Sequence, residues 1–383
     1  MIFKLLIPHT TQVSGIIGKG DTHLKWSLYE SWFNGTVSLI GENVTIYYKV
    51  EGENIPIPLK KVQLNIVLTK DCIQIKSLID LANHGTLDAK FQISNLHKQR
   101  MLFGALHIHS LSISTLNPAL IPGEKISGML NTNLRFGENL KQPKIFGKIH
   151  LNNTCLENNL IPIKFTRSQF TINFKGMRST LKAVIHAAQG KITLNGEAAW
   201  DQIDHWYTRI SMISDRISVI IPPHIHMDIV PNLLFTATPK LYTLMGYINV
   251  PWAHFLAQKI PRSSTQISSD EVLLDKNLQP LKSRFLTIPT KSKILVHVGS
   301  NVSIHAVGLR GKLHGDIEIQ KNHYSISMYG KMHILSGHLH AYAQDLFIRK
   351  GELKFSGCTI QPYLNIEAIR HPEETADDVT VGG

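Results

Sequence analysis

The alternation of apolar and polar residues constrains the fold of this chain more than any other feature. Between residues 337 and 370, Leu353 and Phe355 stand two apart, as do Leu364 and Ile366, with a polar residue inside each pair. Successive side chains of a β-strand point to opposite faces, so each run places its apolar residues on one face of a sheet. The same pattern continues back through most of the chain, and few segments have helical spacing. The sequence therefore predicts an all-β protein.

Glycines recur immediately before or inside these runs, as at Gly128, Gly147, Gly246 and Gly330. Glycine tolerates the positive φ of tight hairpins, so each is interpreted as a turn that leads into a strand. The spacing between successive glycines varies, which indicates a degenerate repeat and not a strict solenoid. One strand in about every eighteen residues gives roughly twenty strands, and an antiparallel meander of that size is on the order of 100 Å long.

A sheet with one apolar face must bury that face against helices, against a second sheet, in lipid, or by curling on itself. Helices are not predicted, and no apolar run reaches the eighteen or so residues that a membrane helix needs. A second sheet is possible, but a continuous meander of this length more naturally curls lengthwise. We therefore predict an elongated, curled antiparallel sheet with an apolar lumen.

The regularity of the pattern changes along the chain. It increases beyond about residue 235, which predicts a β-groove repeat region in residues 1–235 and a C-terminal domain in residues 236–383. Within the second region, residues 260–292 are rich in Ser, Pro and charge, as expected for an irregular insertion.

The composition narrows the choice of partners. The chain has 383 residues, 43% of them hydrophobic, and a net charge of +12 at pH 7. This content is too apolar for a disordered chain. The basic residues stand singly at alternate strand positions and do not cluster with aromatic residues, which predicts a solvated outer face and no nucleic-acid partner. Examples are Lys148, Lys191, Lys312, Lys331 and Lys354.

Histidine supplies the candidate metal ligands. On a strand, the two histidines of a His-x-His pair face the same side, as zinc ligands sometimes do. The residues inside the pairs are mostly apolar, and no carboxylate or cysteine lies at a spacing that would complete a site. The three cysteines are far apart and odd in number. We predict solvent-facing histidines and no catalytic, cofactor or metal site. The pairs are His107 and His109, His224 and His226, and His338 and His340.

The predicted working surface is a stripe of apolar side chains along the lumen; the alternative for each residue is an ordinary core position. Burying an acyl chain along such a stripe is favourable by about 0.8 kcal/mol per methylene, or roughly 10 kcal/mol for a sixteen-carbon tail before ordering costs. The predicted lumen residues are Ile294, Val296, Val298, Val302, Ile304, Leu313, Ile317, Ile319, Ile326, Met328, Met332, Ile334, Leu346, Ile348, Leu353, Phe355, Leu364 and Ile366.

Several stretches resemble the C-terminal region of the TamB family. This family comprises inner-membrane-anchored subunits of the translocation and assembly module of Gram-negative bacteria. The similarity covers about residues 236 to 381, whereas residues 1–235 are compatible in style. The matching stretches are Gly246-Tyr-Ile-Asn-Val-Pro-Trp252, Ser268-Ser-Asp-Glu-Val272, Asn277-Leu-Gln-Pro280, Val296-His-Val-Gly299, and His340-Ala-Tyr-Ala-Gln-Asp-Leu346 continuing to Arg370.

The resemblance implies a β-taco fold of the AsmA-like, repeating β-groove group, with an apolar lumen in a chain that bridges the periplasm. It implies a non-enzymatic role in outer-membrane protein and autotransporter assembly, in phospholipid transport to the outer membrane, or in both. The implied partners are TamA, an outer-membrane protein of the Omp85 type, and either phospholipid acyl chains or nascent outer-membrane proteins.

Family members continue beyond the point where this sequence stops and carry an N-terminal membrane anchor. We therefore expect an internal fragment without its anchor, or the product of a split or decaying gene. Two other functions stay open at this stage. An outer-membrane β-barrel also alternates, but Trp and Tyr do not form the two girdles of such a barrel. A secreted β-rich adhesin would act through its surface and would not bind an acyl probe.

Overall fold

The structure, a computed structural model, confirms an all-β protein. Among the described residues the helical elements are two 3-10 helices, η1 (Ile113–Ala119) and η2 (Ile203–His205). All other named elements are strands. The described residues are 16–17, 35–50, 53–81, 85–120, 124–157, 165–187, 189–201, 203–221, 225–257, 289–306, 308–322, 325–341, 344–357, 362–370 and 380–382.

The chain divides into two compact units, Met1–Ile210 and Ser211–Gly383, called the N-terminal and C-terminal units below. Strand β12 (Tyr207–Ser214) contains the boundary. In the N-terminal unit, β2 through β11 pair in chain order, each antiparallel to the next. Its strands are β1 (Ile16–Ile17), β2 (Gly35–Val50), β3 (Glu53–Thr69), β4 (Cys72–Leu81), β5 (Gly85–Ser94), β6 (Met101–Ser112), β7 (Lys125–Gly137), β8 (Lys144–Glu157), β9 (Phe165–Gly176), β10 (Arg178–Ala187) and β11 (Lys191–Ala199).

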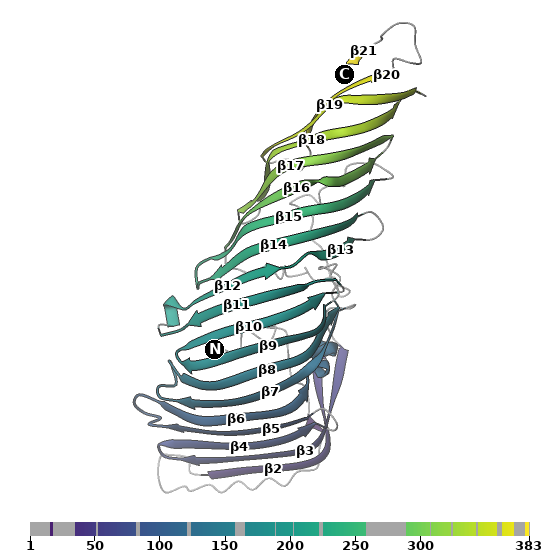
Figure 1. Ribbon diagram of the computed structural model, residues 1–383. Coiled ribbons are helices and arrows are strands. Elements are labelled where there is room, and N and C mark those ends of the chain that lie inside the picture. The colour runs from purple at the N-terminus through teal and green to yellow at the C-terminus, as the bar shows by residue number, and fades with distance from the viewer. Residues whose placement is uncertain are drawn as a thin grey trace, which may run out of the picture. The chain divides into compact units, whose positions relative to one another are not determined.

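The C-terminal unit is a curled, unclosed sheet, and its strands also pair in chain order (Figure 1). The long strands alternate between buried and exposed positions, as the sequence pattern predicts. Its strands are β13 (Ile217–Ile221), β14 (Ile225–Ala237), β15 (Tyr242–Ala257), β16 (Thr290–Ala306), β17 (Leu309–Asn322), β18 (Ser325–Ala341), β19 (Gln344–Gly357), β20 (Tyr363–Arg370) and β21 (Thr380–Gly382).

One pairing departs from the predicted meander. Strands β15 and β16 run parallel, with Ile248 opposite Val296 and Phe255 opposite Ile304. Parallel neighbours need a crossover of a dozen residues or more, and the chain between these two strands is long enough to supply it. The predicted insertion at residues 260–292 falls in this connection. Of it, the structure describes residues 289–292, and residues 290–292 begin β16.

The interpretation of the recurring glycines as turns is wrong at most of these positions. Gly147, Gly246 and Gly330 lie inside β8, β15 and β18. Their φ angles are 126°, 142° and 129°, values that L-residues rarely adopt. At Gly246 a Cβ atom would lie 2.2 Å from the backbone oxygen of Asn232 on the neighbouring strand. These glycines therefore mark bends and close strand approaches within the sheet.

The predicted domain boundary at residue 235 is based on the regularity of the apolar alternation, and it stays a prediction. In the structure this position lies inside β14, while the compact units meet between Ile210 and Ser211. The predicted outer face agrees with the side-chain exposure, because Lys148, Lys312 and Lys331 are all exposed. No helix among the described residues has the length and apolarity needed to cross a membrane.

Candidate functional site

The candidate site is the apolar face of the C-terminal unit. Its centre is a cluster of buried residues that includes Val250 and Ala253 of β15, Val302 of β16 and Leu313 of β17. Ala253 and Val302 are 0% and 1% exposed, although they belong to a single sheet. Partly buried side chains extend the cluster from β14 to β20, seven neighbouring strands. At about 4.8 Å per strand, the face is roughly 30 Å wide.

Cross-strand register explains why these side chains meet. Val302 lies opposite Leu313, and Leu313 lies opposite Ile334. Directly opposed residues project from the same face and their Cβ atoms are close together, so a row of them packs as a unit. Full burial of a side chain of this size contributes about 1.5–3 kcal/mol to stability.

Most of the predicted lumen residues lie on this face. Among them, Val298, Val302, Leu313 and Ile334 belong to the buried cluster. Six others are partly buried against it, and three more are buried elsewhere in the same unit. The partly buried residues are Val296, Ile304, Met332, Ile348, Leu353 and Ile366, and the other buried residues are Ile317, Leu346 and Phe355. Ile294, Ile319 and Met328 are of intermediate burial.

Two predicted lumen residues are exposed. Leu364 is 65% exposed and Ile326 is 45% exposed. Register still assigns Leu364 to the apolar face, because it pairs with Leu353. It lies near the start of β20, where β21 contributes no partner: the pairing of β21 reaches only residues 367–369 of β20. Leu364 is exposed because the neighbouring strand β21 is too short to cover it.

The sequence analysis missed the part of the face that β14 and β15 supply. Met227 and Ile229 of β14, and Ile248 and Phe255 of β15, pack against the cluster. Alternation at Ile248 and Val250 was a usable signal. It breaks at Pro251, where the register of β15 shifts, so the inward positions beyond the break change parity.

The opposite, outward face carries polar side chains in cross-strand pairs. The Nζ atom of Lys331 lies 2.7 Å from Oε1 of Glu352, and the Nζ atom of Lys293 lies 3.2 Å from Oε2 of Glu318. The hydrogen bond from Lys331 lowers the pKa of the Glu352 carboxyl. Hydrogen bonds from Gln320 and then from Lys293 lower the pKa of the Glu318 carboxyl. Each of these carboxylates is therefore engaged by a neighbouring side chain on the outward face.

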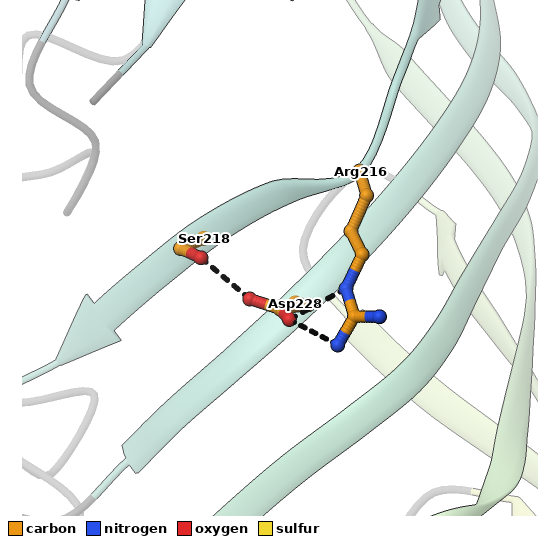
Figure 2. Close-up of polar contacts among 3 residues, drawn as sticks. All are labelled: Arg216, Ser218 and Asp228. Atoms are coloured by element: carbon orange, nitrogen blue, oxygen red, sulfur yellow. Dashed lines mark hydrogen bonds and ion pairs between the residues drawn. The ribbon is translucent and has the colours of Figure 1, made fainter. Parts of the chain in front are cut away.

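A polar contact that the sequence analysis did not identify joins β13 to β14 (Figure 2). Asp228, only 9% exposed, accepts a hydrogen bond from Nε of Arg216 at 2.6 Å and one from Oγ of Ser218 at 2.5 Å. A buried carboxylate requires such partners, because an unpaired one is costly to desolvate. The register pairs Asp228 with Ser218, so the contact ties the short β13 to the sheet. Its signal in the sequence is an aspartate between Met227 and Ile229.

The histidines of the His-x-His pairs face solvent where the structure describes them. His107, His109, His226 and His338 are exposed. His340 is exposed too, and its Nδ1 lies 2.7 Å from Oδ1 of Asp345 on the next strand. His224 lies outside the described residues, as does Cys358. Cys72 and Cys155 are free thiols of intermediate burial.

Comparison with known proteins agrees with this architecture. The model of the TamB C-terminal domain matches residues 179–383, more than half of the chain. The chain belongs to the TamB family. The model of the TamB N-terminal domain matches residues 1–151, so the family assignment also covers the region that resembled TamB only in style.

A curated TamB relative supports the assignment. The translocation and assembly module subunit TamB of Haemophilus influenzae is 30% identical over 360 residues, or 92% of this chain. The chain spans 28% of that relative's length. The apolar face is thus part of a TamB-type sheet.

Proposed function

We propose that this chain is a non-enzymatic segment of a periplasm-spanning TamB-type protein, and that its apolar face shields apolar cargo between two membranes. In this proposal the intact protein is anchored in the inner membrane and works with a TamA-type partner of the Omp85 class at the outer membrane. Its role is outer-membrane protein and autotransporter assembly, phospholipid transport to the outer membrane, or both.

The observation that carries the proposal is the continuity of the apolar face over seven neighbouring strands of the C-terminal unit. A specific pocket is not needed to stabilise an acyl chain in water. Each buried methylene contributes about 0.8 kcal/mol, so a sixteen-carbon tail that lies along the face gains roughly 10 kcal/mol before ordering costs. Partly buried residues such as Val296 and Met332 are the surfaces that such a chain would contact.

A matched pair of variants tests the shielding function. Val296 is partly buried against the cluster, whereas Phe103 of β6, in the N-terminal unit, is 48% exposed and lies outside the apolar face. We expect Val296→Asp to abolish phospholipid co-purification with the chain, because a carboxylate on the face is costly to bury beside an acyl tail. Phe103→Asp should leave the lipid content unchanged. Circular dichroism checks that both variants are folded.

Unchanged lipid content in folded Val296→Asp would refute an apolar conduit along this face. A double substitution, Ile317→Asp with Ile334→Asp, is a more drastic form of the same test, since both residues are buried. If it unfolds the chain, the partly buried Val296 position still gives the answer.

Protein cargo is the second candidate, because a nascent outer-membrane β-strand also presents apolar side chains and could add to a sheet edge. In-cell photo-crosslinking separates the two. A crosslinker at Met328, of intermediate burial on β18, should capture cargo, while one at Phe103, 48% exposed on β6 of the N-terminal unit, should not. Lipid adducts at Met328 would support phospholipid transport, and outer-membrane protein adducts would support assembly.

A further inference from the structure

The outward face of the C-terminal unit carries a row of basic side chains. His226 of β14 lies opposite His254 of β15, and the ring centroids of His254 and His305 are 4.8 Å apart. His305 of β16 lies opposite Arg310 of β17, which in turn lies opposite His338 of β18. Five neighbouring strands thus contribute one imidazole or guanidinium each. We refer to these five residues as the basic row.

The described groups around the basic row leave it electropositive. Lys312 stands two residues along β17 from Arg310 and adds to the positive charge. Two carboxylates are near: Asp228, which is engaged by Arg216, and Asp345, which is engaged by His340. Arg310 and Lys312 therefore give the row two cations, while both nearby carboxylates already have a partner. This agrees with a chain that has 40 Lys and Arg against 28 Asp and Glu, and 20 histidines besides.

An exposed apolar patch lies on the same face, toward the other end of the strands. Its members are Leu234, Met245, Tyr247 and Leu295, which are 38%, 49%, 51% and 45% exposed. Leu234 lies opposite Met245, and Tyr247 lies opposite Leu295. Trp252, 40% exposed, stands on β15 between the patch and His254. Outward-facing apolar residues therefore form a group and are not scattered.

We propose that this outward face docks on an anionic lipid bilayer surface. Basic side chains near a membrane are attracted to its anionic headgroups. Tyrosine, tryptophan and other apolar side chains favour the headgroup region, where one part of the residue is apolar and the other is wet. A soluble acidic partner would engage the basic row and leave the apolar patch exposed, so the combination favours a membrane. The inference goes beyond the shielding function, which concerns the opposite face.

Flotation of the full chain with vesicles tests the inference. We expect binding to phosphatidylcholine vesicles that contain phosphatidylglycerol, and little binding to pure phosphatidylcholine. Arg310→Gln combined with His338→Gln should weaken binding at least about fivefold, since each cation near the surface contributes attraction. Tyr247→Ser combined with Leu295→Ser should weaken it comparably.

Two controls make the result specific. Lys148→Gln with Lys182→Gln removes two exposed cations from the N-terminal unit and should leave binding unchanged. Val296→Asp alters the shielding face and should also leave vesicle binding unchanged, so failure of the shielding proposal is distinguishable. Equal binding to neutral vesicles, or full binding by the Arg310 and His338 double variant, would overturn membrane docking. So would binding to soluble polyglutamate in place of vesicles, which would indicate an acidic protein partner.

Discussion

The N-terminal and C-terminal units are built from the same kind of sheet but differ in what their buried face contains. In the N-terminal unit, Thr132, Thr154 and Ser168 are buried, and Thr154 lies opposite Ser168 in the register. In the C-terminal unit, the cluster from β14 to β20 is apolar, and buried Asp228 points away from it. Under the proposed shielding function, the apolar cluster of the C-terminal unit is the part expected to contact an apolar chain.

The units also differ in which residues occupy their bends. The N-terminal unit bends at glycines such as Gly147 and at other residues as well. In the N-terminal unit, Ser110, Asn153 and Arg167 have φ angles of 49°, 52° and 48°, and β-bulges occur at or beside these residues. Among the described residues of the C-terminal unit, positive φ values occur only at glycines, such as Gly315 and Gly330. Glycine adopts these angles without steric strain and adds no side chain to the apolar face. The bends of the apolar face therefore add no polar side chains to it.

The largest expected effect concerns these glycine bends. Gly330→Ala should destabilise the chain by about 3 kcal/mol or more, because φ is 129° and the new Cβ would lie 2.2 Å from the Asp316 carbonyl oxygen. Gly147→Ala in the N-terminal unit should cost as much, since its Cβ would clash with the carbonyl oxygen of Asn133. Gly137→Ala is the control, because no atom lies within 4 Å of its new Cβ. Urea unfolding followed by circular dichroism measures all three.

The next effect tests the apolar cluster as a core. Leu313 is 4% exposed, and Leu313→Ala should lower the free energy of unfolding by about 2 kcal/mol. This value is at the lower end of the usual range, because a thin sheet can relax around the cavity. Leu295→Ala on the outward face should change stability by less than about 0.5 kcal/mol. Equal losses in the two variants would show that the two faces are not distinct in packing.

A substitution at a buried position of the N-terminal unit should raise the stability of the chain instead of lowering it. The Oγ1 atom of Thr154 is buried without a hydrogen-bond partner, so Thr154→Val should stabilise the chain by about 1 kcal/mol. Thr171→Val is the matched control. Its hydroxyl lies 3.1 Å from Nδ1 of His150, and its removal should be neutral or destabilising. A loss of stability in Thr154→Val would mean that the buried hydroxyl has a structural role in this unit.

The smallest effect is electrostatic and depends on pH. The hydrogen bond from Lys331 lowers the pKa of Glu352 below its ordinary value of 4.5, so the carboxylate stabilises the fold above that pH. This contribution is lost as the pH falls through the lowered pKa of the folded state. Glu352→Gln should therefore be slightly less stable than the parent at neutral pH, and the difference should vanish in acid. Lys354→Met, which keeps the bond from Lys331 to Glu352, should not alter this pH dependence.

The sequence predicted the composition of the apolar face well in the region where alternation is unbroken. Val296, Val298, Met332 and Ile334 all lie on it. It missed the part supplied by β14 and β15, although Ile248 and Val250 alternate there. Beyond Pro251 the register of β15 shifts, so the inward residues Ala253 and Phe255 have the other parity. It also misread strand-interior glycines as turns, since a turn and a bend both require positive φ and differ only in whether the strand continues.

The sequence by itself determined where the strands form and which residues of a strand share a face. It could do so because the alternation with a period of two is a property of each strand alone. Its resemblance to TamB followed from the same local stretches. Only the tertiary structure decided which strands are neighbours, including the parallel pairing that places Ser303 beside His254 at 2.9 Å. That contact, like the basic row and the engagement of Asp228, depends on register between segments distant in sequence. Hydrogen bonds and packing across the whole sheet select such a register, and no single segment encodes it.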